Sequence, residues 1–522
     1  MRHSLLAVIA VLVGVAPVAR GDVSLNNMFG DHMVLQQGIK TRVWGKAEPG
    51  EAVTVTLVGQ KPQAAVAAAD GAWEVFLEPV QDYGGPHTLT VKGRNEITFR
   101  DVLIGEVWVC SGQSNMQWSV NQSNDADLEK AAAKFPNIRL LSVPQVGTQE
   151  PAWNFEGRWS VCSPETVGEF SAVGYLFGRQ LHQTLGVPVG LIDNAWGGSA
   201  AEAWVKRDKL ARHPTLKAIH ENWLAEEANL ANATAEFEKK LHDWKAAAAQ
   251  AKAEGKKEPS GKPQGPDQRM KGNARPGNIH SGVLTPSIGY GIRGAIWYQG
   301  ESNAGRAYQY RELFPHMIRS WREEWGVGDF PFYWVQLADF KPEKGEPAES
   351  DWAELREAQT MTMKALPNTG EAVIIDLGEG KDIHPKNKQD VAKRLARWAL
   401  AETYKVPAIT CRSPLYTSME KEGGKIVLSF DHVADGGKGW RPFDVNEPIG
   451  FTIAGADRTF VAAKAAIRGD GRIEVWSDSV SDPVAVRYAW ADNPVCNMYS
   501  TDGLPLTPFR TDDFPGVTAA AK

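Results

Sequence analysis

The sequence is poor in cysteine, has no large excess of either charge, and has no long apolar run after its first twenty residues. Four cysteines among 522 residues, with no Cys-x-x-Cys pair, exclude a disulfide framework and argue against a structural zinc site. The formal net charge is −6 and the pI is near 6.1, so the chain lacks the basic surface that binds nucleic acid or anionic membranes. We therefore expect no nucleic-acid partner and no membrane span, which would need roughly 18 apolar residues.

What remains is the composition of an ordinary globular protein, with 43% hydrophobic and 23% charged residues. At roughly 100–200 residues per domain, this length predicts two to four domains. Tryptophan is unusually frequent, with 19 residues. Its rings fill protein cores, but exposed rings also stack on the apolar faces of sugars, and both uses stay open.

Residues 1–21 have the pattern of a secretory signal peptide. Arg2 and His3 precede an apolar run from Leu5 to Ala16, and the residues up to Gly21 offer a cleavage point. The run is too short to span a bilayer, which disfavours an N-terminal anchor. We expect the mature protein to be exported to the periplasm or to the outside of the cell.

Three segments with different patterns follow. Residues 22–102 form short alternating runs broken by Gly and Pro, which predicts a small antiparallel β-sandwich. Residues 103–404 alternate apolar runs with helical stretches, which predicts an α/β domain with a parallel sheet buried on both faces. Its expected strands are Val102–Cys110, Val187–Ile192, Gly294–Tyr298, Phe332–Leu337 and Ala372–Leu377.

Two further features complete this organisation. A stretch rich in Ala, Lys and Glu, about residues 206–272, interrupts the α/β domain and predicts a helical hairpin or lid with a loop. Residues 405–522 return to strand patterns and predict a C-terminal β module.

The strongest chemical signal is Gly112-Gln113-Ser114-Asn115-Met116, directly after the first strand of the predicted parallel sheet. A serine at the carboxyl end of such a strand lies where α/β sheets bind their ligands, and N–H groups at a helix start can stabilise an oxyanion. Ser114 is thus a candidate nucleophile, and Gln113 a candidate substrate-binding residue. The alternative is that Ser114 only caps a helix.

His384 is the candidate base for this serine. It lies in Asp382-Ile383-His384-Pro385, after the last predicted strand and before a helix that we expect to begin at Pro385. Asp382 lies two residues earlier, on the same side of an extended chain, where it can orient the imidazole. The alternative for His384 is a helix cap without a catalytic role.

Two more polar loops follow predicted strands. The loop at residues 297–303 offers Gln299 and Asn303 as oxyanion or substrate-binding residues, and Glu301 as a second carboxylate for the histidine. The loop at residues 193–202 contains Gly197 and Gly198, whose N–H groups can approach a substrate closely, although two glycines alone favour a tight turn. Because all these loops end parallel strands, we expect them to share one site.

Three of these motifs together resemble the sialate O-acetylesterase family, a group of carbohydrate esterases in the SGNH-hydrolase superfamily. They are Gly112–Met116, Trp297–Asn303 and Asp382–Pro385. The resemblance covers nearly the whole mature chain, from Phe29–Gln37 to Pro508–Arg510. It implies an SGNH-hydrolase-like parallel sheet, and removal of O-acetyl groups from sugars, above all sialic acid esters, without a metal or organic cofactor.

The resemblance also implies roles for individual residues. Ser114 would be the nucleophile and His384 the base of a serine acyl-enzyme mechanism. The oxyanion hole would use the Ser114 N–H, a glycine of the 197–198 pair and a side chain near Gln299.

The identity of the triad acid stays open. Many members of the superfamily place it three residues before the histidine, where this chain has Lys381. Asp382 stands one residue later, whereas related acetylxylan esterases use the glutamate that corresponds to Glu301. Either position is physically acceptable, because the acid orients the histidine and stabilises its charge rather than taking up its proton. We favour Asp382.

Two other functions fit the sequence. Acetylated xylan or another polysaccharide is an alternative substrate, because specificity depends on loop shape. A non-catalytic sugar-binding protein on a hydrolase scaffold is an alternative of another class, which the intact serine, histidine and carboxylates disfavour. The implied partner is an O-acetylated sugar or glycan, and the sequence leaves the oligomeric state, the cysteine pairing and the role of the insertion undetermined.

Overall fold

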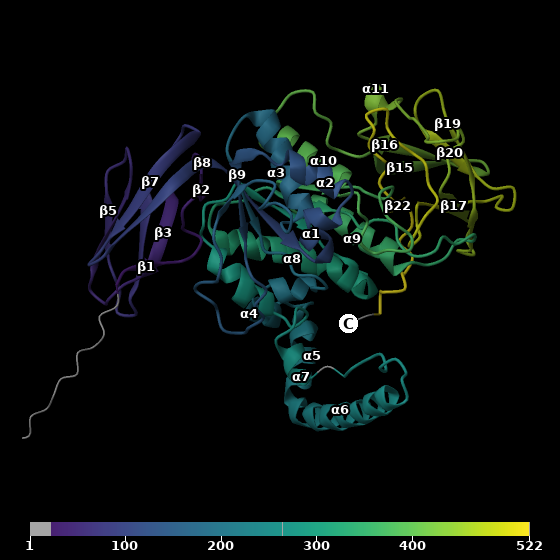
Figure 1. Ribbon diagram of the computed structural model, residues 1–522. Helices are drawn as coiled ribbons and strands as arrows, with labels where there is room; N and C mark the ends of the chain where they lie inside the picture. The colour runs from purple at the N-terminus through teal and green to yellow at the C-terminus, as the bar shows by residue number, and fades with distance from the viewer. Residues whose placement is uncertain (1–21, 264, 521–522) are drawn as a thin grey trace, which may run out of the picture.

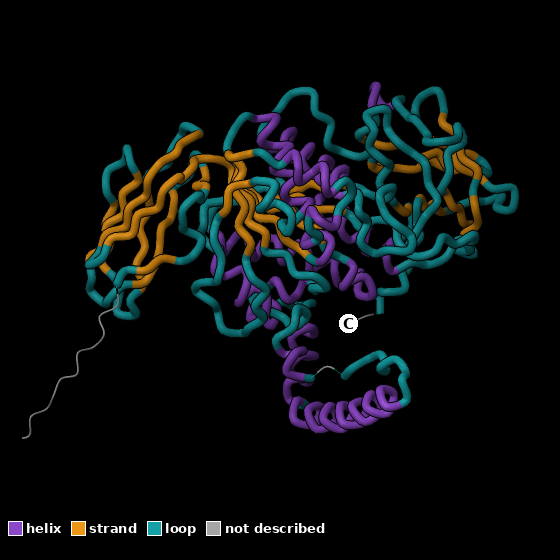
Figure 2. Tube along the Cα trace, viewed as in Figure 1, coloured by secondary structure: helices purple, strands orange, loops and turns teal. Residues whose placement is uncertain are grey.

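The computed structural model describes residues 22–263 and 265–520; the predicted leader, residues 1–21, lies outside the described part. Figure 1 shows an N-terminal β domain, a central α/β domain and a C-terminal β domain in a row, with a helical arm beneath the centre. Helices are concentrated in the central domain and the arm, and strands in all three domains (Figure 2). The predicted mixed α/β class with β modules at both ends is confirmed.

The N-terminal domain packs two sheets against each other around a shared apolar core. One sheet has the order β1-β3-β6, and the other continues from β5 through β4, β7 and β8 to β2. The pairing of β2 with β8 is parallel, whereas the prediction was purely antiparallel. The strands are β1 (Ser24–Leu25), β2 (Val34–Gln36), β3 (Thr41–Lys46), β4 (Ala52–Leu57), β5 (Gln63–Val66), β6 (Ala72–Leu77), β7 (Gly84–Lys92) and β8 (Glu96–Gly112).

Strand β8 belongs to two domains. Its first part pairs with β7 in the N-terminal domain, and Glu106–Gly112 pairs with strands of the central sheet. The boundary expected at residue 102 therefore lies inside one continuous strand.

The central sheet has the order β10-β9-β11-β8-β12-β13-β14, and every neighbouring pair except β10–β9 is parallel. Its other strands are β9 (Phe135–Ser142), β10 (Ser160–Cys162), β11 (Val189–Asp193), β12 (Gly294–Tyr298), β13 (Phe332–Val335) and β14 (Thr369–Ala372). β12 has the predicted bounds. The last strand was predicted wrongly, because β14 ends at Ala372, where the expected strand Ala372–Leu377 begins, and β9 was not predicted.

Helices cover both faces of this sheet. Trp108 and Cys110 of β8 share a core with α3 and α10, whereas Val107 and Val109 share the other core with α8 and α9. The helices of this domain are α1 (Ser114–Gln117), α2 (Ala126–Ala132), α3 (Ala172–Leu185), α4 (Arg207–Arg212), α8 (Ala307–Trp325), α9 (Asp351–Ala365) and α10 (Lys388–Trp398). Short 3₁₀ or π turns are η1 (Val120–Gln122), η2 (Ala201–Trp204), η3 (His280–Leu284), η4 (Thr285–Ser287), η5 (Glu301–Arg306) and η6 (Ala399–Thr403).

The predicted insertion forms a helical arm made of α5 (Lys217–Ala228), α6 (Leu230–Ala253) and α7 (Pro266–Met270). Helix α6 has no buried residue and lies below the central domain in Figure 1. None of the helices in the described part of the chain is both long and apolar enough to cross a membrane.

The C-terminal domain contains two antiparallel four-stranded sheets, as the strand pattern predicts. Their orders are β15-β16-β20-β19 and β18-β17-β21-β22. The elements are β15 (Leu415–Glu422), β16 (Lys425–Asp431), α11 (Ala434–Gly437), β17 (Phe451–Ala454), β18 (Phe460–Ala462), β19 (Lys464–Ile467), β20 (Ile473–Trp476), β21 (Ala485–Tyr488) and β22 (Phe509–Arg510). All four cysteines of the chain are free.

Candidate active site

Ser114 follows the central strand of the parallel sheet. β8 lies between β11 and β12, so its carboxyl end is at the crevice where the chain connections of the sheet diverge. The chain turns at Gly112, whose φ of +134° and contact with the Tyr298 backbone leave no room for a side chain; an added Cβ would lie 2.2 Å from the Tyr298 oxygen. This tight turn places Ser114 at the first position of α1.

The structure brings Ser114 and His384 together. The Oγ of Ser114 lies 2.9 Å from the Nε2 of His384, a hydrogen-bonding distance between residues 270 positions apart. His384 lies in a loop, as predicted, but the following helix α10 begins at Lys388, not at Pro385, and is capped by the Asn387 side chain. The pairing is the geometry of a nucleophile with its general base.

His384 is held at its ring and at its backbone. Trp118 stacks on it with ring centroids 4.5 Å apart and planes 13° apart. The backbone N–H of His384 donates to the Oδ1 of Asp382 at 2.9 Å. Burial lowers the pKa of His384 below its ordinary value, and the Asp382 charge opposes this effect. The lowered pKa favours the neutral imidazole, the form that can accept a proton.

Of the two candidate acids, Asp382 is the one beside the histidine. Its Oδ1 lies 3.6 Å from Nδ1 of His384, longer than a hydrogen bond but close enough for a strong charge interaction. The side chain of Asp382 is 43% exposed, so water partly screens that interaction. Glu301 accepts no hydrogen bond from the ring among the described residues: its Oε1 accepts one from Asn115 Nδ2 at 2.7 Å.

Glu301 belongs to a buried polar network behind the catalytic pair. Asn115 Nδ2 also donates to the Ile383 carbonyl at 2.9 Å, and Asn115 Oδ1 accepts from the Nζ of Lys388 at 2.6 Å. Burial lowers the pKa of Lys388 to about 7 and raises the pKa of Glu301, and each group's charge partly opposes the shift of the other. The network ties the residue next to the nucleophile to the loop that carries His384.

Three predicted binding residues do not reach the site. The amide nitrogen of Gln299 donates to the Ser199 carbonyl at 3.1 Å and to Asn303 Oδ1 at 2.7 Å, and both side chains are buried. The Oε1 of buried Gln113 accepts weak hydrogen bonds from the backbone of the 300–302 loop. These side chains fix the loops around the site, because the hydrogen-bonding groups of Gln299 and Asn303 are already used and the Oε1 of Gln113 is bonded to the loop backbone. This geometry does not support their predicted contact with the substrate.

The two glycines do lie at the site. An added Cβ on Gly197 would be 3.4 Å from the Cβ of Ser114, so this loop lies directly against the nucleophile. The Gly197 N–H donates to Gln117 Oε1 at 2.7 Å, and Gly198 is exposed with a φ of +72°. The Ser114 N–H has no acceptor within the described ranges, which leaves it available to an oxyanion.

An open cleft of about 420 Å³ leads to the catalytic pair. It is lined by Ser114, Gln117, Trp118, Ser119, Gln122, Ser142, Val143, Gln145, Glu169, Asp193, Ala195 and His384. Of the tryptophans near the predicted loops, Trp118 lines the cleft, whereas Trp204 and Trp297 are fully buried core residues. Burial raises the pKa of Asp193, on the cleft wall, to about 7.

Sequence reasoning missed the roles of Asn115, Gln117 and Lys388. Asn115 and Lys388 stand inside or beside the motifs already quoted, but no sequence signal distinguishes a buried lysine from an exposed one. Their function becomes visible only when the two loops are brought together.

Comparisons with known proteins show the family of this chain. Residues 104–231 and 283–401 match the family described as "Carbohydrate esterase, sialic acid-specific acetylesterase". The chain is 30% identical to mouse sialate O-acetylesterase, with 92% of each chain covered, and 28% identical to the human enzyme, with 91% of this chain and 90% of that one covered.

A solved structure is similar over most of the chain. The fold superposes on a carbohydrate acetylesterase from Xanthomonas citri with a TM-score of 0.77 and 37% identity, covering 94% of this chain and all of the other. The matched segments contain Ser114, Gly197, Glu301, Asp382 and His384. The chain therefore belongs to the sialic acid-specific acetylesterase family and is a carbohydrate esterase.

Proposed function

We propose that this esterase removes O-acetyl groups from sugars through an acyl-enzyme on Ser114. The observation that carries the proposal is the 2.9 Å contact between Ser114 Oγ and His384 Nε2 at the end of an open polar cleft. Asp382 orients the histidine, because it is the carboxylate near Nδ1, and Glu301 serves the network around Asn115.

In the first half of the reaction, His384 Nε2 takes the Ser114 proton while Oγ forms a bond to the acetyl carbonyl carbon. The carbonyl electron pair moves to its oxygen, which accepts hydrogen bonds from the Ser114 N–H and the Gly197–Gly198 loop. When this pair returns, the bond to the sugar oxygen breaks and His384 gives its proton to that oxygen. The sugar leaves with a free hydroxyl group.

In the second half, water replaces the sugar. His384 takes a proton from water, whose oxygen attacks the acetyl carbon and forms a second tetrahedral anion in the same hole. Collapse of this anion returns the proton to Ser114 Oγ and releases acetic acid, which ionises in solution. The enzyme then has its starting protonation state again.

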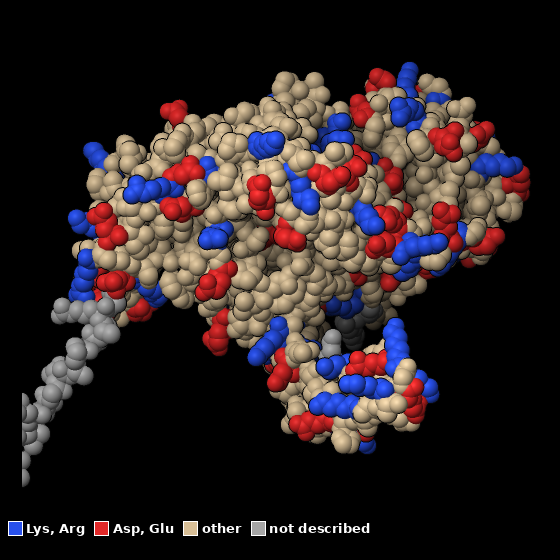
Figure 3. Space-filling model, viewed as in Figure 1, with Lys and Arg blue, Asp and Glu red and all other residues tan. Residues whose placement is uncertain are grey.

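Two classes of acetylated sugar are candidate substrates. The names of the mammalian relatives point to an acetylated sialic acid. The cleft favours a second candidate, a neutral acetylated glycan, because none of the described residues that line it is Lys or Arg, whereas Glu169 and Asp193 are acidic. A sialic acid carboxylate would find no cation there. On the face of the molecule seen in Figure 3, charges of both signs are interspersed.

Acetate release from a 9-O-acetylated sialic acid and from acetylated xylan tests the proposal. We expect activity that is lost in Ser114→Ala and retained in Ser479→Ala, a matched change at an exposed serine of the C-terminal domain. Activity on xylan that exceeds activity on the sialic acid supports the neutral glycan. Activity that survives in Ser114→Ala contradicts the mechanism.

The competing function, a sugar-binding protein without catalysis, predicts a different result. Wild-type protein would then release no acetate from either substrate or from a small aryl acetate, and a fluorophosphonate probe would leave Ser114 unlabelled. We expect labelling of the wild type and none of Ser114→Ala.

We also propose export, on the pattern of residues 1–21. Expression of the full chain with subcellular fractionation tests it. A mature protein that begins near residue 22 outside the cytoplasm supports export, and an uncleaved cytoplasmic protein contradicts it.

A further inference from the structure

The root of the helical arm contacts the glycine loop of the active site. Asn273, three residues after α7, donates its side-chain Nδ2 to the carbonyl oxygen of Gly197 at 2.5 Å. The backbone oxygen of Asn273 accepts from the Ala200 N–H at 3.2 Å. The segment of chain that leads from the arm back to the central domain is thus hydrogen-bonded to the glycine loop at two points.

This contact fixes a peptide group beside the nucleophile. In a trans peptide the C=O and the next N–H point in opposite directions, so holding the Gly197 oxygen also sets the direction of the Gly198 N–H. That N–H has no acceptor among the residues that the structure describes. Two successive glycines can adopt many conformations, so without this anchor the Gly198 N–H would not keep one direction, whereas the Gly197 N–H is already bonded to Gln117.

The segment just before Asn273 is bonded to the buried residue Asn278. The Nδ2 of buried Asn278 donates to the carbonyl oxygens of Met270 and Gly272, at 2.9 and 2.8 Å. Its Oδ1 accepts a hydrogen bond from Gln149 at 2.6 Å. The short segment between α7 and Asn278 is therefore tied to the central domain by hydrogen bonds, as a positioning role requires.

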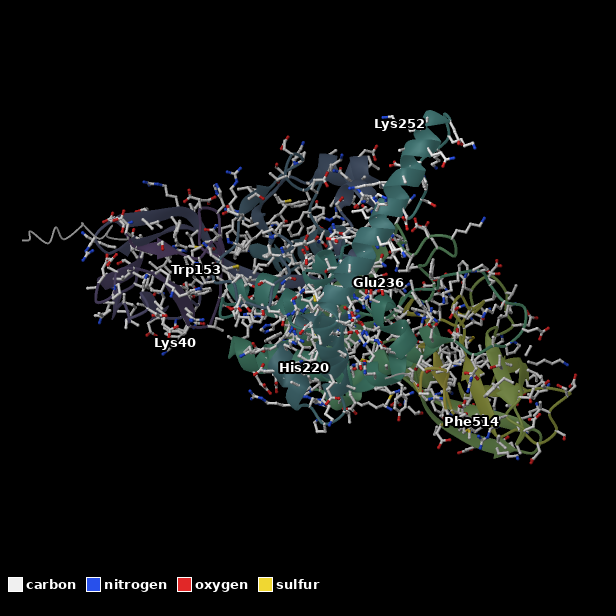
Figure 4. All side chains as sticks on the ribbon, turned by 90° about the horizontal axis from the view of Figure 1, so that it is seen from below. Lys40, Trp153, His220, Glu236, Lys252 and Phe514 are labelled. Atoms are coloured by element: carbon white, nitrogen blue, oxygen red, sulfur yellow. The ribbon has the colours of Figure 1, made fainter. Side chains whose placement is uncertain are left out.

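The rest of the arm is attached to this support but extends away from the site. Glu227, at the end of α5, pairs with Arg207 at 2.7 Å and with Arg275 at 2.9 Å, which joins the arm to the central domain. Seen from below, Glu236 and Lys252 mark α6, whose Lys252 end projects past the neighbouring domains (Figure 4). Asn273 lies in the stretch 232–282 that the family match does not include.

We propose that Asn273 is a positioning residue for the oxyanion hole, acting on the acetyl carbonyl through the Gly197–Gly198 peptide. The part of the insertion that contributes to catalysis is the segment after α7 that contains Asn273, and the far end of α6 is not required for this role. The inference rests on the serine mechanism proposed above, since only a developing oxyanion needs these N–H groups in place.

The first test compares Asn273→Ala with Asn232→Ala, a matched change on the exposed surface of α6. We expect kcat of Asn273→Ala to fall about 10- to 100-fold, because loss of a whole donor costs about 10² to 10³. KM should change less than threefold, since Asn273 is not among the residues that line the cleft. Asn232→Ala should match the wild type, and a kcat of Asn273→Ala within twofold of wild type overturns the proposal.

A second variant covers the case in which Asn273→Ala does not fold. Asn273→Asp keeps the size of the side chain but replaces the donor with an acceptor that repels the Gly197 oxygen, so kcat should fall at least as far. Circular dichroism and thermal melting establish that the variant is folded. A folded Asn273→Asp enzyme with unchanged kcat overturns the proposal as well.

A small alkylboronic acid separates positioning from a general structural defect. It forms a reversible tetrahedral adduct with a catalytic serine, so its affinity should fall by about the same factor as kcat/KM in Asn273→Ala. Unchanged boronate affinity together with reduced kcat would contradict the role in the oxyanion hole. Failure of the serine mechanism itself gives a different result: Ser114→Ala would stay active and the boronate would bind neither protein.

Discussion

Replacing Asp382 by Asn is the sharpest test of the catalytic geometry. The carboxylate lies 3.6 Å from His384 Nδ1. At that separation the attraction for an imidazolium is about 1 kcal/mol in bulk water and about 5 kcal/mol at an effective dielectric constant of about 20. Because the Asp382 side chain is 43% exposed, solvent screening favours the lower part of this range. We expect kcat/KM of Asp382→Asn to fall about 10- to 100-fold.

This loss is smaller than the roughly 10⁴-fold drop in kcat that follows removal of a buried triad aspartate in a serine protease. The matched variant is Glu301→Gln, which keeps an oxygen for the Asn115 hydrogen bond of 2.7 Å. It should lose less than tenfold in rate but should melt at a lower temperature, because buried Lys388 loses its counter-charge.

The assay is steady-state hydrolysis of an aryl acetate and of the preferred acetylated sugar, with melting curves for every variant. If folded Glu301→Gln is nearly inactive while Asp382→Asn keeps most of its rate, the assignment is refuted and the glutamate is the triad acid. Equal losses in both variants would mean that the Asn115 network contributes as much to orienting the histidine as the aspartate does.

Three further predictions follow from the same geometry. The acid limb of the pH profile of kcat/KM should have its midpoint below pH 6.5, because burial lowers the pKa of His384. In Asp382→Asn the midpoint should move lower still, because the aspartate charge raises that pKa. A wild-type midpoint at or above pH 6.5 contradicts this reasoning. The pKa of Asp193 is about 7 when folded against 3.8 ordinarily, so its contribution to stability is present below about pH 4 and is lost as the pH rises to 7. Asp193→Asn should therefore raise the free energy of unfolding at pH 8 by up to about 4 kcal/mol. Chemical denaturation at pH 4 and pH 8 tests this, and equal free energies of unfolding for variant and wild type at pH 8 would contradict it. Trp118→Ala should raise KM and lower kcat by removing the ring stacked on His384, whereas Trp118→Phe should keep most of the activity; steady-state kinetics that give the same values for both variants would exclude a stacking role.

The sequence predicts the parts of the fold that one local pattern determines. β12 has its predicted bounds, Gly294–Tyr298, because a fully buried central strand is a continuous apolar run between polar residues. The apolar run at residues 372–377 misleads, since Val373 and Ile375 lie in the core of the C-terminal domain. Their hydrophobicity reflects packing against another domain, which no local pattern reveals.

The same distinction applies to the site. The meeting of Ser114 with His384 was predictable because their loops follow strands of one parallel sheet, and strand ends meet at one edge of such a sheet. For His384 the strand is β14, which ends earlier than predicted. The orientation of an amide was not predictable. Gln299 stands in the expected loop, yet its donors are used by Ser199 and Asn303, and only the folded structure shows which acceptors compete for them.

The continuity of strand β8 limits where this protein can be truncated. Seventeen residues run without a break from the N-terminal domain to the turn before the nucleophile. No flexible linker separates the two domains at this point, so a protease has no exposed loop to cleave there. An expressed fragment that starts near residue 103 would begin in the middle of a hydrogen-bonded strand. The N-terminal domain and the esterase core should therefore unfold as one cooperative unit, and a shortened enzyme is better designed from the arm or from the segment between Tyr404 and β15 than from the apparent domain boundary.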